Sequence, residues 1–533
     1  MSLQFEFPLS LTAEQFIAEL SRETDTQLAS TQSYSKTYYD SFDWRLYSND
    51  VSCEFTVRLR SRQAVDGANK QAISKVERQA DSALTLRSLK SGLMIAGSAL
   101  KKVPSFGKAF EPGIIRDKLT PLLEMRALLP VCRLDYQLYR LNIVNEDQKT
   151  ILRLLVEEYG SFNNRVLLQP VKGYDKAAEQ LAELLTTSLN LTATDAPVLL
   201  KALQVQGRQP NDYSSKLNIN LDPAMRADIA GKLIYSHLLK AIKVNEQDTI
   251  TATDSEFLHD FRVAIRRTRA ALSQIKHILP DQISAYYADF FSWLGQVTGP
   301  TRDLDVYLLS FEDYKNSLPE SIREDLDPLY DFLLVKQQKA QQELAKKLQS
   351  TRYLSTLSEW EQYLKEPSYS QAMGKNAQLT IKALADQRIW KSFTRVLEEG
   401  EAINDQSPAE SLHDLRKSCK KLRYLMEFFQ SLYPEDQIKQ LIKSLKGLQE
   451  VLGDFQDFAV QEHTLKVFSE EMITLNVPAH TFLAMGALIQ DLDAHRSNAR
   501  KDFGSKFAEF KQDQNQSAFK LLLAPTKIRK DQH

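Results

Sequence analysis

The pattern of apolar and polar residues changes along the chain. Between Val51 and Arg60 apolar and polar positions alternate, which predicts a strand with one apolar and one cationic face. Arg133 to Val144 and Thr150 to Tyr159 predict two further strands, joined by a polar turn. Ala13 to Leu20 and Tyr174 to Leu189 have the spacing of amphipathic helices. Residues 1–206 are therefore predicted to form a domain that mixes strands with helices.

The second part of the chain is almost wholly helical in pattern. A polar segment with Gly and Pro at residues 207–215 is predicted to be a linker. In residues 216–510 Pro and Gly are sparse and fall between long periodic segments, which predicts an all-helical domain. Residues 511–533 are mostly polar and end basic, so we expect a disordered tail there.

The helical part contains an internal repeat. The block from Leu258 to Arg269 recurs from Leu412 to Arg423, at an offset of 413 − 259 = 154 residues and without a gap. A second pair of blocks keeps the same offset, from Leu294 to Val306 and from Leu448 to Val460. The glycines of this second pair, Gly299 (followed by a proline) and Gly453, predict a break or kink in that helix.

The repeat extends upstream of these blocks. Lys240 aligns with Arg395 at an offset of 155, so the loop before the histidine is one residue shorter in the second copy. Loops tolerate such changes in length. Each copy therefore has at least three matched helices, at about residues 222–315 and 378–470.

Each copy of the first block predicts a helix with an apolar row and a basic row beside it. The first of these helices is expected to span Glu256 to Leu279. The predicted core positions are Leu258, Phe261, Ile265, Leu272, Ile275 and Leu279 in the first copy, and Leu412, Leu415, Cys419, Leu422, Met426 and Phe429 in the second. The basic rows are His259, Arg262, Arg266 and Arg269, and His413, Arg416, Lys420 and Arg423.

These basic rows have the chemistry of an anion-binding surface. A helix rises about 5.4 Å per turn, so each row presents roughly one cation per turn to a linear polyanion. Arginine binds phosphate oxygens in bidentate fashion. The alternative is a solvated face paired with acidic residues, but after Asp260 and Asp414 the helices contain no acidic residue until Glu427. Asp303 and Asp457, in the second pair of blocks, are predicted to orient a histidine or a nearby arginine.

Composition narrows the class of protein. The chain has 68 basic and 69 acidic residues and a net charge of −1, so anion binding must come from local clusters. Its three cysteines form no CxxC pair, which fits a reducing cytosol and predicts no zinc site. The N-terminus lacks the pattern of a signal peptide, and no segment approaches the roughly 20 apolar residues of a membrane span. We therefore expect a cytoplasmic protein with no membrane partner.

The doubled block at residues 258–269 and 412–423 resembles the CHAD family, the conserved histidine α-helical domain, over about Lys216 to Phe510. The resemblance implies two pseudo-symmetric four-helix bundles around a basic cavity. It also implies binding of inorganic polyphosphate and association with polyphosphate granules. The binding residues it implies are the two basic rows, with Lys240 and Arg395 as additions on neighbouring helices. Whether the histidines contact the ligand or act as caps or packing residues stays open.

The first domain resembles, more faintly, the CYTH or triphosphate tunnel metalloenzyme domain. The resemblance lies in Thr37 to Asp40 leading into Arg58-Leu59-Arg60, in Val156-Glu157-Glu158 and in Pro170 to Tyr174. It implies an antiparallel β tunnel lined by charged side chains. The whole chain is then a two-domain α+β protein.

The family's Glu-x-Glu-x-Lys hallmark is degenerate in this chain. Gln4 stands in place of the first glutamate and Pro8 in place of the lysine, which leaves Glu6 alone on that strand. A Mg²⁺ or Mn²⁺ site for phosphoanhydride hydrolysis needs several carboxylates, and only Glu157 or Glu158 is at hand to help. We therefore expect no cofactor and no catalytic residue. The arginines expected to hold an anion in the tunnel without hydrolysing it are Arg58, Arg60 and Arg62.

The leading hypothesis is a non-catalytic protein that binds inorganic polyphosphate through the two basic helices. The first alternative is a divalent-metal-dependent triphosphatase or polyphosphatase that uses the N-terminal domain with Mg²⁺ or Mn²⁺. The second is a nucleic-acid-binding or scaffolding protein. Slight aromatic interleaving in the basic rows argues against nucleic acid, because single strands are bound by stacking on aromatic side chains.

Overall fold

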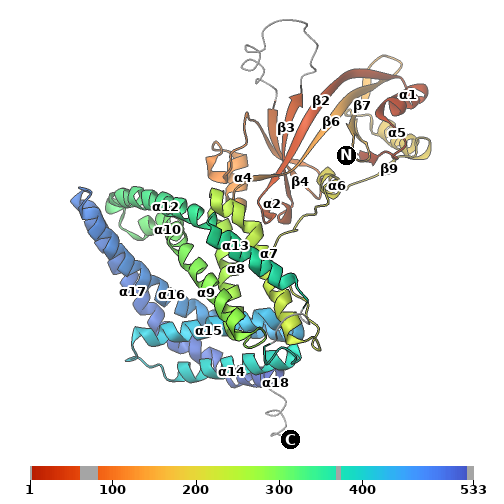
Figure 1. Cartoon of the computed structure of the whole chain (residues 1–533). Coiled ribbons are helices and arrows are strands. Elements are labelled where there is room, and N and C mark those ends of the chain that lie inside the picture. The colour runs from red at the N-terminus through yellow and green to blue at the C-terminus, as the bar shows by residue number, and fades with distance from the viewer. Residues whose placement is uncertain (1–2, 60–81, 216, 368–373, 525–533) are drawn as a thin grey trace. The chain divides into compact units, whose positions relative to one another are not determined.

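The chain divides into two compact units in the computed structural model, Met1–Ser214 and Ser215–His533 (Figure 1). The structure describes residues 3–59, 82–215, 217–367 and 374–524. Each unit is described by itself below, because each has its own cores and its own candidate chemistry.

The first unit is built on an antiparallel sheet whose strands run in the order β5-β4-β3-β2-β6-β7-β8-β1-β9. The strands are β1 (Leu3–Glu6), β2 (Thr26–Asp40), β3 (Val51–Leu59), β4 (Ser82–Ser88), β5 (Met94–Ala99), β6 (Leu129–Val144), β7 (Thr150–Tyr159), β8 (Arg165–Pro170) and β9 (Thr192–Ala193). The three strands predicted from alternation, now β3, β6 and β7, are confirmed, and β6 and β7 pair directly as the predicted hairpin.

Helices cover one part of this sheet. The helices are α1 (Ala13–Glu23), α2 (Arg45–Ser48), α4 (Ile114–Leu123), α5 (Asp175–Thr187), α6 (Val198–Val205) and the short 3₁₀ turn η1 (Gly107–Ala109). A capping box starts α1, since the side chain of Thr12 accepts the N–H of Gln15 and the side chain of Gln15 accepts the N–H of Thr12. Phe16 of α1 and Leu181 of α5 are buried in one core with apolar residues of β1 and β6 to β8.

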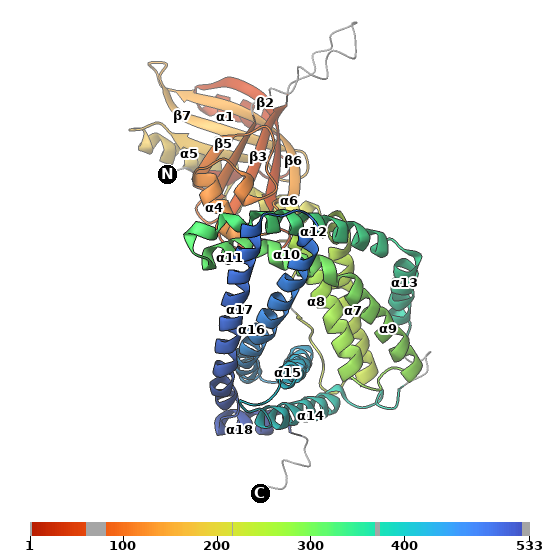
Figure 2. The same ribbon diagram turned by 90° about the vertical axis from the view of Figure 1, so that its left-hand side faces the viewer.

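The second unit is helical in its described residues. Its longer helices are α7 (Ala227–Thr251), α8 (Ser255–Gln274), α9 (Asp281–Val297), α10 (Gly299–Leu309), α12 (Asp327–Leu348), α13 (Thr351–Lys365), α14 (Ile381–Glu401), α15 (Ala409–Phe429), α16 (Glu435–Ile473), α17 (Ala479–Phe510) and α18 (Asp513–Leu523). Shorter turns are α11 (Phe311–Ser317), η2 (Glu320–Ile322), η3 (Glu324–Leu326) and η5 (Gln430–Leu432). Helix α7 packs on α8, and α16 lies along α17 (Figure 2).

The internal repeat appears as matched helices. Helix α7 corresponds to α14, α8 to α15, and α9 with α10 to the single long helix α16. The predicted break is confirmed in the first copy, where α9 ends at Val297 and α10 starts at Gly299. It is wrong in the second, because α16 runs without interruption through Gly453. The difference follows from Pro300, which has no N–H for a helical hydrogen bond, whereas the matching residue, Asp454, has one.

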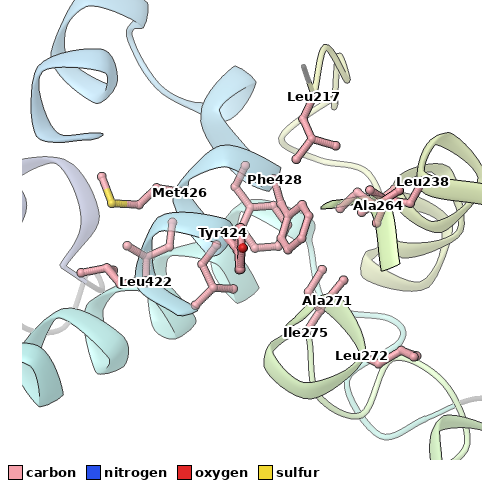
Figure 3. Packing of buried hydrophobic residues seen from close by; sticks show 14 of the residues in the cluster. Leu217, Leu238, Ala264, Ala271, Leu272, Ile275, Leu422, Tyr424, Met426 and Phe428 are labelled. Atoms are coloured by element: carbon pink, nitrogen blue, oxygen red, sulfur yellow. The ribbon is translucent and has the colours of Figure 1, made fainter. Parts of the chain in front are cut away.

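The two copies share one apolar core. Every predicted core position of α8 and α15 is buried. Figure 3 shows side chains of α15, among them Tyr424 and Phe428, facing Leu217 and Ala264 of the first half of the unit. The two basic helices are therefore held against each other by contacts that neither copy makes alone.

Two predicted boundaries are wrong. Helix α8 ends at Gln274 and not at Leu279, because the chain turns through His277, which has a positive φ of 60°. The region predicted as a disordered tail contains α18, whose Phe519 packs on Phe393 with ring centroids 4.0 Å apart. The apolar residues of this otherwise polar segment are buried by packing against α14, α16 and α17. Residues 525–533 lie outside the described part of the chain.

Candidate anion-binding site

Along the first basic row, on α8, Arg262 is held by hydrogen bonds and the following arginines are exposed. Nη1 of Arg262 donates to the carbonyl of Gly295 at 3.2 Å and to Oγ1 of the buried Thr298 at 2.9 Å. One turn and two turns further on, Arg266 and Arg269 are exposed. Nη2 of Arg269 lies 3.5 Å from Oγ of Ser292. The packing of α9 thus fixes the direction of the row at Arg262 and leaves the following arginines able to meet a ligand.

The second basic row is held by residues of α16. Nδ1 of His413 lies 2.8 Å from Oε1 of Gln456. Nη2 of Arg416 lies 2.9 Å from Oδ1 of Asp457, and the arginine side chain is only 16% exposed. Asp457 therefore contacts the arginine and not the histidine, which is one of the two roles predicted for it. The histidine is oriented by an amide that the sequence did not single out.

The matched glycines stand beside the matched arginines. A Cβ atom at Gly299 would lie 3.6 Å from Nη1 of Arg262, and one at Gly453 would lie 3.7 Å from Nη2 of Arg416. These are ordinary van der Waals distances, so any longer side chain would occupy the space next to the guanidinium. The duplication has kept both the cation and the room beside it.

The two rows meet through Arg266 and Lys420. Burial, together with the nearby positive charges of Arg416, Arg266 and Arg423 and against the opposite effect of Asp457, lowers the pKa of Lys420 to about 8. Arg266 belongs to α8 and the other cations to α15, so both copies contribute to one cluster. Repulsion between these like charges raises the free energy of the unbound protein. A polyanion in contact with the cluster offsets that repulsion.

Neighbouring positive charges also affect Arg262, near the start of α8. Burial lowers the pKa of the Arg262 guanidinium, Asp303 opposes this, and Arg266 and Arg269 add to it. Asp303 therefore acts on the arginine in the first copy, as Asp457 does in the second. The predicted orienting residues fall at equivalent places next to equivalent arginines.

Several guanidinium groups of the site keep buried N–H groups without a partner. Among the described residues, the Nε–H groups of Arg416, Arg423 and Arg267 are buried and donate to no hydrogen-bond acceptor. A buried donor without an acceptor costs free energy, of the order of 1–3 kcal/mol. Because these Nε groups are buried, a ligand can reach them only if the arginine side chains move.

Three more of the predicted binding residues are Lys240, Arg395 and His259. Lys240 is exposed on α7, and Arg395 on α14 is paired with Glu399 at 2.6 Å, so the charge of Arg395 is compensated. His259 is half buried in α8. It does not cap the helix, because the carboxylate of Asp254 accepts the N–H groups of Glu256 and Phe257.

Sequence reasoning missed the ion pair that joins the two copies. Nη2 of Arg267 lies 3.2 Å from Oε2 of Glu427, and both side chains are largely buried. Nε of Arg423 approaches the same carboxylate at 3.8 Å. Glu427 was visible as the first acidic residue after a long basic stretch, but its partner in α8 is 160 residues away. Periodicity along one helix carries no signal for such a contact.

The first unit contains a second charged pocket, lined by residues of β1, β2, β3, β4, β7 and β8. Nζ of Lys36 lies 3.5 Å from Oε2 of Glu54 and 3.9 Å from Oε1 of Glu157. Burial alone would lower the pKa of Lys36, but Tyr38 and the two carboxylates raise it well above its ordinary value. Lys36 therefore stays charged and neutralises the carboxylates of the pocket from within.

Arg165 brings an unsatisfied cation to the same pocket. Its side chain is 3% exposed and its Nη1 donates to the carbonyl of Ala196 at 2.6 Å. Nε and Nη2 of Arg165 are buried without a hydrogen-bond partner in the described residues. The predicted tunnel arginines do not supply this charge, because Arg58 is exposed near the end of β3. Arg60 and Arg62 lie outside the described residues.

The carboxylates considered for a metal are dispersed. Glu6 lies 3.6 Å from Nζ of Lys201, and Glu157 accepts a short hydrogen bond from Tyr159. Glu158 points to the other face of its strand, where it accepts the N–H of Ala13 and the hydroxyl of Tyr139. Within the described residues, no three His, Cys, Asp or Glu side chains are grouped as metal ligands. The residues present do not fit a divalent cation, since Lys36 already balances two of the carboxylates.

Comparison with known families decides the nature of the second unit. The model of the CHAD domain matches residues 234–466, which include both basic rows and both orienting aspartates. Residues 234–466 form a CHAD domain. The resemblance read from the doubled histidine block is thereby confirmed, over a shorter range than the 216–510 expected from the sequence. The all-helical fold expected for this part is confirmed as well.

The proteins found to be similar match about half of this chain. An uncharacterised protein of Mycobacterium tuberculosis is 26% identical over 244 residues, which is 45% of this chain and 45% of that protein. The chain therefore matches about half of the length of this relative. A solved CHAD domain from the plant Ricinus communis is 25% identical and covers 53% of this chain and 95% of its own, with a TM-score of 0.44.

Two further solved structures are similar to part of the chain. PptA from Streptomyces chartreusis is 16% identical and covers 53% of this chain and 99% of its own, with a TM-score of 0.42. HpAC1 of Hippeastrum, described with a dominant triphosphatase activity, is 14% identical and covers 40% of this chain and 99% of its own, with a TM-score of 0.26. The antiparallel sheet of the first unit rests on its own strand pairing. Among the described helices, none is long and apolar enough to cross a bilayer.

Proposed function

We propose that this protein binds inorganic polyphosphate through the basic rows of α8 and α15, without catalysis by the CHAD domain. The observation that carries the proposal is the cluster around Arg266 and Lys420, to which both copies of the repeat contribute. A linear polyanion with one charge per phosphate matches cations that recur at every helical turn. Association with polyphosphate granules in the cytoplasm would follow from this binding.

The physical basis of the proposal is electrostatic. The cluster holds several cations partly shielded from water, where charges interact more strongly than on an open surface. The exposed Arg266 and the half-buried Lys420 form no ion pair within the described residues, so their N–H groups can meet a phosphate. Affinity built in this way falls as salt is added. A nucleic acid carries the same phosphate charge but also needs stacking partners for its bases.

The test reverses the charge of the two cations at the centre of the cluster. Arg266→Glu combined with Lys420→Glu should abolish binding of long-chain polyphosphate. Neither side chain forms an ion pair within the described residues, so the fold should persist. A matched control reverses two exposed lysines of α12, Lys339→Glu with Lys347→Glu, and should bind as the unaltered protein does. This pair is called the α12 control below.

Binding is measured by calorimetry at fixed salt, with folding checked by circular dichroism. Equal binding by the folded Arg266→Glu, Lys420→Glu variant and by the α12 control would refute the proposal. Competition with single-stranded RNA separates the two polyanions. RNA that displaces polyphosphate at equal phosphate concentration would favour the nucleic-acid alternative. Phosphate release from tripolyphosphate with Mg²⁺ or Mn²⁺, lost on Glu6→Ala, would favour the enzyme alternative.

A further inference from the structure

A second basic surface lies next to the cluster, on the N-terminal part of α16. A groove with a volume of about 1040 Å³ is lined by cations of three helices. They are Arg267 of α8, Arg423 of α15, and Lys439, Lys443 and Lys446 of α16. Because Arg423 also belongs to the second basic row, the groove begins where that row ends.

The lysines of α16 form a row of their own. Lys439, Lys443 and Lys446 are four and three residues apart, so they share one face of the helix over about 10 Å. Lys439 is paired with Glu435. Lys443 and Lys446 are exposed, and no ion pair involves them within the described residues. These two charges are therefore available to a ligand.

The two acidic side chains that line the groove, Glu427 and Glu435, already form ion pairs. Glu427 is held by Arg267 at 3.2 Å and approached by Arg423 at 3.8 Å. Nε of each of these arginines is nevertheless buried without a hydrogen-bond partner among the described residues. The groove thus combines two free ammonium groups of α16 with the guanidinium groups of Arg267 and Arg423, and such groups bind phosphate.

One wall of the groove is the segment from Leu217 to Asn220. The carbonyl of Leu217 accepts from Nε2 of Gln430 at 2.7 Å, and the N–H of Leu221 donates to Oγ of Ser431 at 3.1 Å. Both leucines are buried in the shared core. The wall is therefore fixed to the end of α15, and the groove has a defined width before any ligand arrives.

We propose that this groove extends the polyphosphate site and selects for chain length. The proposal rests on the proposed function of the basic rows. A long chain lies along the rows of α8 and α15, passes Arg423 and continues over Lys446 and Lys443. A short chain fills the cluster around Arg266 and does not reach the lysines of α16. Chain length then sets the affinity, because each further phosphate contact adds to the electrostatic attraction.

The experiment compares two ligands on three proteins. The groove variant is Lys443→Glu with Lys446→Glu, the matched control is the α12 control, and the ligands are tripolyphosphate and long-chain inorganic polyphosphate. The groove variant should bind the long chain at least about tenfold more weakly and tripolyphosphate unchanged. The slope of log affinity against log salt should fall by about 1.4 for the long chain, if each lost contact counts as it does for single-stranded nucleic acid.

Several results would overturn the inference. One is a groove variant that loses affinity for both ligands equally, and another is an α12 control that loses as much as the groove variant. The groove variant could bind both ligands normally while Arg266→Glu with Lys420→Glu abolishes binding. That result would refute this inference and leave the proposed function standing. An unaltered protein that binds no polyphosphate sinks the proposed function. Lys443→Gln with Lys446→Gln repeats the test with a smaller charge change, should the reversal disturb the fold.

Discussion

Lys420 gives the cluster a dependence on pH that an ordinary lysine would not. Burial and the neighbouring arginines hold the pKa of Lys420 at about 8 in the unbound protein. A bound polyanion favours the charged form and raises that pKa. Binding therefore takes up a proton once the pH exceeds about 8, and affinity falls as the pH rises further. Arginine at this position stays charged throughout, because the guanidinium does not titrate in this range.

The size of the effect follows from the fraction of unbound protein that is protonated. With a pKa of about 8, about nine tenths of the Lys420 side chains are charged at pH 7 and about one tenth at pH 9. Affinity for polyphosphate should then fall about tenfold between these two values. In the Lys420→Arg variant it should change by less than about twofold.

The assay is calorimetric titration with long-chain polyphosphate at constant ionic strength. A long chain is used because its terminal phosphates, which titrate in this pH range, carry little of its total charge. Titration in two buffers of different ionisation enthalpy counts the protons taken up directly. Lys421→Arg, at the exposed neighbouring position, serves as the control and should follow the unaltered protein. The reasoning is refuted if Lys420→Arg loses affinity as steeply as the unaltered protein does, or if the unaltered protein shows no loss.

Two further predictions concern stability. Gly400→Ala would place a methyl group onto the ring of Phe507, so it should destabilise the second unit by about 1–3 kcal/mol, measured by urea unfolding. An unchanged midpoint would mean that the ring moves freely. Lys36→Met leaves Glu157 without this cation and Glu54 with Arg87 alone, and should destabilise the first unit by about 1–3 kcal/mol, seen as faster hydrogen exchange in its sheet. Unchanged exchange in β2 and β3 would contradict that role.

Local patterns of apolar and polar residues predicted much of the fold. Alternation predicted β3, β6 and β7, and helical spacing predicted the buried rows of α8 and α15, because the period of a side-chain pattern depends only on neighbouring residues. The sequence did not predict the end of α8 or the helix α18. The end of α8 and the presence of α18 depend on contacts with distant segments, and these contacts outweigh a polar composition.

For the candidate site, too, some features follow from the sequence and others only from the tertiary structure. The sequence by itself determined which cations recur in both copies, since the repeat preserves them in register at an offset of 154 residues. Only the tertiary structure decided which of them meet. Arg266 and Lys420 form one cluster, Arg267 pairs with Glu427, and Lys443 joins the groove of Arg423. The physical reason is that periodicity fixes the face of one helix, whereas the distance between two faces is set by the core packed between them.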